Sequence, residues 1–191
     1  MTGNTAGENP AEYRTLTLEA YADTIVPGEK RCPEDRAVAG AAPGGGAVAA
    51  GALELMRWDA TGISDGLDEL ADLLNAHARS YASETGAELD PSLPPFVALD
   101  FPHRTSLVQR LTSPGHPEKE FWVLLALFSN MSFDSAAHRH TAEALADGHP
   151  GLTAMGMTRP DADGLWRFVK PGYGRALARL HPDTTSSGSP A

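Results

Sequence analysis

The segment from residue 133 to 156, FDSAAHRHTAEALADGHPGLTAMG, holds three of the chain's seven histidines and two aspartates. Imidazoles and carboxylates that lie close together can bind a metal ion or exchange protons with a substrate. If residues 133–147 form one helix, Asp134 and His138 share a face, whereas His138 and His140 lie about 200° apart around the axis. We therefore expect an aspartate–histidine pair inside or beside the core, in preference to a metal site on this helix.

A metal-binding α-protein is an alternative interpretation of the same residues. A zinc site needs three or four ligands, and this helix offers no HxxxH or ExxH pair to supply two of them. The ligands would have to come from separate parts of the chain. The candidates are His103, His116, Asp134, His138, His140 and His149.

His149 directly follows Gly148 and precedes Pro150. A glycine just after a helix and a proline soon after it are typical of a helix C-terminus. His149 would then lie at the negative end of the helix dipole, which favours the protonated imidazole and requires no catalytic role.

Other patterns for catalysis or phosphate binding are weak. The stretch PGGGAVAAG, residues 43–51, lacks both the GxxxxGK[ST] and the GxGxxG pattern, and no GxSxG motif is present. Cys32 is the only cysteine, which excludes an intrachain disulfide and a site with several cysteine ligands. We assign no cofactor from these patterns.

The elements that must position these residues are helical. Apolar residues recur at helical spacing, and period-2 alternation typical of strands is absent. We expect Thr15 or Thr17 to cap the first helix and Ser64 to cap the third. The predicted class is all-α, a compact orthogonal or irregular bundle of about six to eight helices in a single domain over residues 14–182, with disordered polar tails at 1–13 and 183–191. The predicted helices cover about 15–26, 47–58, 64–84, 102–112, 118–128, 133–147 and 173–181.

Composition excludes two classes of partner. The formal charge is −10 and the fifteen basic residues are scattered, which argues against nucleic-acid binding. No apolar run approaches the roughly 20 residues of a membrane span. We see no basic leader with an apolar segment at the N-terminus and expect a cytoplasmic protein.

Two parts of the chain resemble a known family. LEAYADTIVPG, residues 18–28, is followed by an Ala/Gly-rich stretch and resembles the start of the gluconate 2-dehydrogenase subunit 3 family. FDSAAHRHTAEA, HPGL, PDADGLWR and YGRALARLHP, which begin at residues 133, 149, 160 and 173, resemble motifs of an uncharacterised actinobacterial branch of that group. The resemblance covers about residues 15–185.

The resemblance implies a function without catalysis. Members of that family are all-helical, carry no redox centre and serve as the small accessory subunit of sugar dehydrogenases. The catalytic subunit is a flavoprotein of the glucose–methanol–choline oxidoreductase type, which the small subunit helps to mature, stabilise and export. The resemblance therefore implies a flavin-dependent oxidoreductase as partner and no cofactor in this chain. No twin-arginine leader is present, so a role in export is not expected.

An enzyme or small-molecule-binding protein of actinobacterial secondary metabolism is the other alternative. Its pocket would lie between the helix at 133–147 and the C-terminal segment. His140 or His149 would be the acid or base, oriented by Asp134 or Asp161. A ligand or partner surface would be formed by Arg167, Tyr173 and Arg175.

Overall fold

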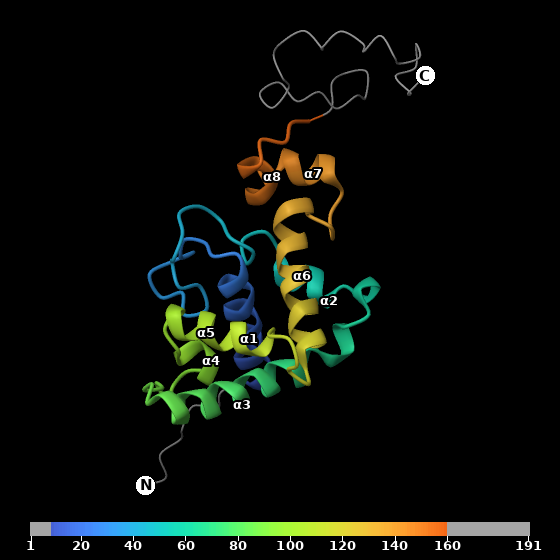
Figure 1. Ribbon diagram of the computed structural model, residues 1–191. Coiled ribbons are helices and arrows are strands. Elements are labelled where there is room, and N and C mark those ends of the chain that lie inside the picture. The colour runs from blue at the N-terminus through green and yellow to red at the C-terminus, as the bar shows by residue number, and fades with distance from the viewer. Residues whose placement is uncertain (1–8, 160–191) are drawn as a thin grey trace, which may run out of the picture.

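The computed structural model describes residues 9–159, and this part of the chain is all-α, as predicted (Figure 1). It has eight α-helices, two short 3-10 helices and no strand within the described range. The α-helices are α1 Pro10–Ile25, α2 Ala52–Arg57, α3 Leu67–Thr85, α4 Pro95–Ala98, α5 Phe101–Leu111, α6 Lys119–Ser135, α7 Thr141–Ala146 and α8 Pro150–Ala154. None of these helices is long and apolar enough to cross a membrane.

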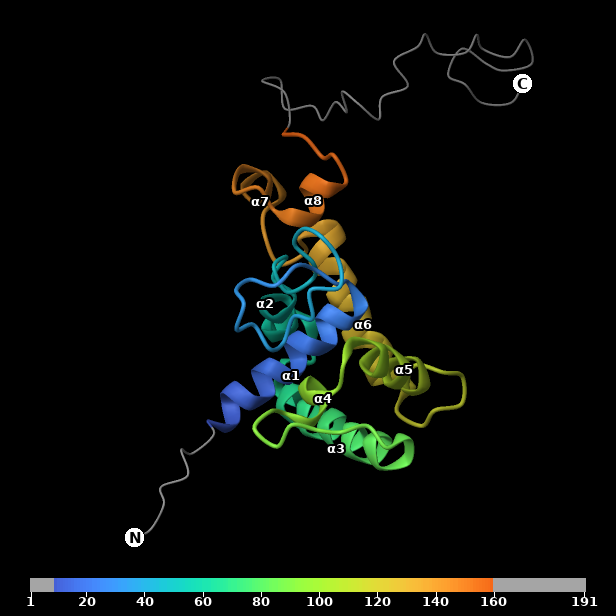
Figure 2. The same ribbon diagram turned by 90° about the vertical axis from the view of Figure 1, so that its left-hand side faces the viewer.

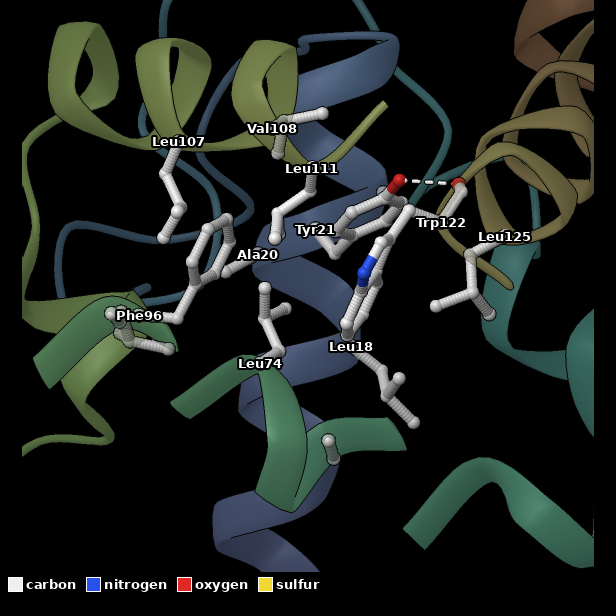
Figure 3. Close-up of a cluster of buried hydrophobic side chains, with 14 of the residues drawn as sticks. Leu18, Ala20, Tyr21, Leu74, Phe96, Leu107, Val108, Leu111, Trp122 and Leu125 are labelled. Carbon is white, nitrogen blue, oxygen red and sulfur yellow. Dashed lines mark hydrogen bonds between the residues drawn. The ribbon is translucent and has the colours of Figure 1, made fainter. Parts of the chain in front are cut away.

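The central helix is α1, which contacts α2, α3, α4, α5 and α6. Tyr21 of α1 and Trp122 of α6 are fully buried, and Phe96 of α4 packs with them in the same cluster (Figure 3). The Tyr21 hydroxyl donates a hydrogen bond of 2.5 Å to the Trp122 carbonyl oxygen, and burial raises the pKa of Tyr21. This contact fixes the start of α6 against the centre of the molecule.

The long connection from α1 to α2 is held by buried polar side chains. Asp23 accepts hydrogen bonds from the backbone N–H groups of Gly28 and Ala39, at 3.2 and 2.9 Å. Arg104 of α5 donates to the carbonyl oxygens of Ala37, Val97 and Leu99, at 2.7, 2.6 and 2.9 Å. Burial raises the pKa of Asp23 and lowers the pKa of Arg104. The loop is therefore ordered by bonds to its backbone.

Close approach of the chain to itself explains two of the glycines in this connection. A Cβ on Gly28 would lie 2.3 Å from the backbone nitrogen of Gly46, and a Cβ on Gly46 would lie 2.4 Å from the Val26 carbonyl oxygen. The helix expected from 47 begins only at Ala52, after a series of turns.

Two helix starts differ from the prediction. α1 begins at Pro10, because the Asn9 side chain accepts a hydrogen bond from the Ala11 N–H and proline is well suited to the first helical position. The cap expected at Thr15 or Thr17 is wrong, and residues 10–13 of the expected disordered tail are helical. Ser64 does not cap α3, since Ser64–Gly66 is a 3-10 helix and Gly66 precedes the first residue of α3.

The predicted helix over 133–147 is wrong. α6 continues to Ser135 and ends at Ala136, which is fully buried and has a left-handed φ of 48°. Residues 137–140 are not helical, and α7 begins at Thr141. The chain turns here because α8 packs back on the end of α6, so tightly that a Cβ on Gly151 would lie 1.8 Å from the Phe133 carbonyl oxygen.

α7 and α8 form a small layer at one end of α6, and α3 lies at the other end in both views (Figure 2). A separate apolar cluster of Ala136, Ala144 and Leu152 holds this layer together. The short helix α4 lies between the predicted helices at 64–84 and 102–112 and was not predicted. The helix predicted at 173–181 lies outside the described residues.

Candidate functional site

A pocket of about 640 Å³ lies where α7 and α8 meet the chain just before and within α2. One wall comes from the segment that the sequence singled out and the other from residues almost a hundred positions earlier. The pocket expected between residues 133–147 and the C-terminal segment stays a prediction, because that segment lies outside the described residues. The lining residues are Ala49, Ala50, Gly51, Glu54, His138, Arg139, Asp147, Gly148, His149 and Pro150.

His149 forms a rigid part of this wall, with 4% of its surface exposed. Its Nδ1 accepts a hydrogen bond of 3.4 Å from the Leu152 N–H, and its Nε2 lies 3.1 Å from the Ala50 carbonyl oxygen. One neutral tautomer satisfies both contacts, with the proton on Nε2. The ring thus ties α8 to the α2 region.

Of the helix end predicted around His149, the position of Gly148 is confirmed and the role of Pro150 is wrong. Gly148 follows α7 with a left-handed φ of 73°, as a glycine after a helix does. Pro150 does not stop a helix but begins α8, so His149 is the N-cap of α8. His149 therefore accepts an N–H at a helix start, and its expected place at a helix C-terminus is wrong.

His138 lies in the loop between α6 and α7, and its Nδ1 is buried without a hydrogen-bond partner. Burial lowers the pKa of His138, the neighbouring His149 and Arg139 lower it further, and Glu54 opposes them. Its ring lies over Gly51, where a Cβ would come within 2.5 Å of Nε2. An unpaired buried polar atom costs about 1–3 kcal/mol, so a group that formed a hydrogen bond with this nitrogen would relieve that cost.

The mouth of the pocket is charged. Arg139 and Asp147 form an ion pair there, and both side chains are partly exposed. Glu54 is exposed on the opposite wall. The pocket therefore combines two imidazoles in its wall with an arginine that an anionic ligand can reach by displacing Asp147.

Several predicted site residues do not meet here. Asp134 is exposed on α6 and does not pair with His138, because the helix that would align them is broken at Ala136. His140 is exposed at the start of α7 and does not line the pocket. Asp161, Arg167, Tyr173 and Arg175 lie outside the described residues.

The predicted metal-ligand histidines have three different surroundings. The Nδ1 of His103 lies 2.9 Å from the Tyr81 hydroxyl, and His138 lies over Gly51. His116 lies beside His77 and Glu118. His103, His116 and His138 therefore do not share a site in the part of the chain that the structure covers.

A second surface feature is an apolar groove between α3 and the start of α6. It encloses about 400 Å³ and is lined mainly by Ile63, Leu70, Leu73 and Phe121, with Glu69 at its edge. Phe121 is 53% exposed. Clustered exposed apolar side chains typically mark interaction sites.

The comparison with known protein families places the chain in a family. The model of a family described as "Family of unknown function (DUF5987)" matches residues 12–191. No curated protein and no solved structure matches the chain significantly. Because the family model covers nearly the whole chain, this protein belongs to the DUF5987 family.

Proposed function

We propose that this protein is a non-catalytic accessory subunit that binds and stabilises a flavin-dependent oxidoreductase of the glucose–methanol–choline type in the cytoplasm. The proposal rests on the resemblance of residues 18–28 to the start of the gluconate 2-dehydrogenase subunit 3 family. The structural observation that supports it best is the apolar groove, in which Phe121 is 53% exposed.

The groove has the character of an anchor site for a partner. Its walls are aliphatic and aromatic side chains on two well-formed helices, so it is preorganised. Binding energy at protein interfaces is concentrated in a few apolar anchors that are desolvated in a central pocket. A partner side chain entering between Leu70, Leu73 and Phe121 would be desolvated in this way.

Mass action provides the mechanism of stabilisation. A subunit that binds only the folded form of its partner stabilises that form by about 2.7 kcal/mol when its free concentration is 100 times the dissociation constant. No catalytic group is needed for this effect. The net charge of −10 favours a partner surface with arginine and lysine around the contact.

The test is affinity purification of the tagged full-length chain from its native host, with the visible flavin absorbance of the eluate as readout. We expect a stoichiometric flavoprotein with the wild type and its loss with Phe121→Asp. Met155→Asp is the matched control, because Met155 is 45% exposed at the far end of the molecule. A colourless eluate from the wild type, or equal recovery with both variants, would contradict the proposal.

A second candidate function is the binding of a small molecule in the pocket beside α2, α7 and α8, as a binding protein or an enzyme of actinobacterial secondary metabolism. The buried Nδ1 of His138 without a partner favours it. His138 and His149, in place of the exposed His140, are then the candidate acid–base groups.

Thermal-shift screening of wild type and His138→Ala against metabolite fractions of the host tests this second candidate. A ligand of the pocket raises the melting temperature of the wild type only, with His140→Ala as the control that keeps the response. If no fraction stabilises the wild type in preference to His138→Ala, the pocket has no such ligand.

A further inference from the structure

The junction of α3 with the start of α6 holds a cluster that the proposed function does not use. It consists of His77 on α3, and of His116 and Glu118 just before α6. One ligand atom from each residue lies within 4.8 Å of the others, and all three side chains are half-buried. Figure 1 shows this end of α6 beside α3.

Glu118 is the fixed member of the cluster. Its Oε2 lies 2.7 Å from the Nε2 of His77 and accepts a hydrogen bond of 3.3 Å from the Trp122 indole N–H. Trp122 is fully buried and therefore holds the carboxylate from the core side. Carboxylate ligands of metals are typically oriented by such an additional hydrogen bond.

His116 approaches from the connection before α6. Its Nδ1 accepts a hydrogen bond of 3.2 Å from the backbone N–H of Glu118, and the ring must release this bond and rotate to offer a nitrogen lone pair to a metal ion. The rings of His77 and His116 are edge to face, with centroids 5.7 Å apart. Two imidazoles and a carboxylate thus converge on one point from two helical segments.

We propose that His77, His116 and Glu118 bind a zinc ion that joins α3 to the start of α6. Two nitrogen ligands and one oxygen ligand suit zinc better than magnesium or calcium, which prefer all-oxygen sites. Zinc binds these atoms at about 2.0–2.2 Å, which sets tetrahedral ligand atoms roughly 3.4 Å apart, so the side chains must readjust from present spacings of 2.7 Å to at most 4.8 Å. Half-buried side chains achieve this by rotation, and water completes the coordination in the exposed fourth position.

The proposed zinc site is independent of the proposed partner, although it borders the apolar groove. His77 follows Leu73 by one helical turn on α3, and Glu118 precedes Phe121 by three residues. It also differs from the metal ligands predicted from the sequence, of which only His116 is a member.

The experiment is calorimetric titration of zinc chloride into the chelator-treated full-length protein. We expect one zinc ion per chain, and at least roughly tenfold weaker binding for His77→Gln, His116→Gln and Glu118→Gln. His140→Gln and Glu120→Gln are matched controls, because both residues are exposed and outside the cluster. Circular dichroism shows whether each variant is folded.

A measurement on the wild type keeps the test valid if a variant does not fold. In ¹H–¹⁵N spectra of the histidine rings, zinc should shift the signals of His77 and His116 and leave His103 and His140 in place. The proposal is overturned if the wild type takes up no zinc at micromolar concentration. It is also overturned if the folded variants bind as tightly as the controls, or if other histidines shift.

Discussion

The two histidine clusters of this protein differ in what holds their side chains. His138 and His149 lie in a layer of short helices that rests on a small apolar cluster and a close glycine contact. His77, His116 and Glu118 lie between two long helices, beside the fully buried Trp122. The first cluster is positioned by backbone contacts and the second by the main core. Glycine substitutions should therefore destabilise the His138–His149 cluster strongly. The structure around His77, His116 and Glu118 should change mainly when a ligand binds.

The largest effect is expected for Gly151→Ala. The new Cβ would meet the Phe133 carbonyl oxygen at 1.8 Å, so α8 must move away from α6. We expect a loss of about 3 kcal/mol in the free energy of unfolding, or separation of the α7–α8 layer with faster amide exchange over 144–157. Urea denaturation and hydrogen exchange measure these outcomes.

Gly66→Ala is the control for this substitution, because no atom lies within 4 Å of its Cβ position. Its stability should change by no more than about 0.5 kcal/mol. Equal effects of the two substitutions would show that the contact between α8 and α6 does not position the pocket.

The next prediction compares the stability lost when one histidine of each cluster is replaced by alanine. His149→Ala removes a buried ring with contacts to Ala50 and Leu152, and we expect a loss of about 2 kcal/mol. His77→Ala in the metal-free protein removes a half-exposed contact with Glu118 and should cost less than about 1 kcal/mol. Urea titrations of both variants without metal give the comparison. The reverse order of the two losses would contradict the assignment of rigidity to the His149 cluster.

A smaller effect is expected for the contact between Gly51 and His138. Gly51→Ala combines a left-handed φ of 84° with a Cβ position 2.5 Å from the ring nitrogen. Gly62→Ala has a similar φ of 73° but no neighbouring atom, so it carries the backbone strain alone. We expect Gly51→Ala to be more destabilising by about 1 kcal/mol. Equal losses in thermal or urea unfolding would mean that the His138 ring moves aside freely.

The smallest expected effect is a pH dependence. Burial lowers the pKa of His138 below the value of 6.5 that it has in the unfolded chain. Below that pH the unfolded chain binds a proton that the folded chain does not, so stability falls as the pH drops from 7 toward 5. His138→Gln should show a smaller fall than the wild type in urea titrations at pH 7 and pH 5. If the stability of His138→Gln falls as much as that of the wild type, other titratable groups cause the pH dependence.

Much of the fold was predictable because its signals are local. The apolar spacing in α1, α3 and α5 indicated helices that overlap most of the observed elements. The end of α6 was not predictable. Ala136 favours helix, and its left-handed conformation is imposed by the packing of Gly151 against Phe133, which no local pattern reveals.

The candidate sites follow the same rule. His138 and His149 were identified because they occur in one short polar segment. The single helix expected over that segment is broken at Ala136, so the expected positions of Asp134 and His140 relative to His138 were wrong. Ala50, Gly51 and Glu54 were missed because they are distant in sequence. His77 was missed because it is distant in sequence from His116 and Glu118, whose spacing was the available signal for the second cluster.

The connection between α1 and α2 has a consequence for how this family can diverge. Asp23 and Arg104 hold this loop through its backbone N–H and carbonyl groups, which every residue type except proline provides in full. Its path is therefore insensitive to most of its own side chains, apart from the buried Asp35, whose carboxylate accepts hydrogen bonds from the backbone N–H groups of Arg31 and Val38. We expect related chains to vary freely in the loop while retaining an acid and an arginine at these two positions and glycines at 28 and 46.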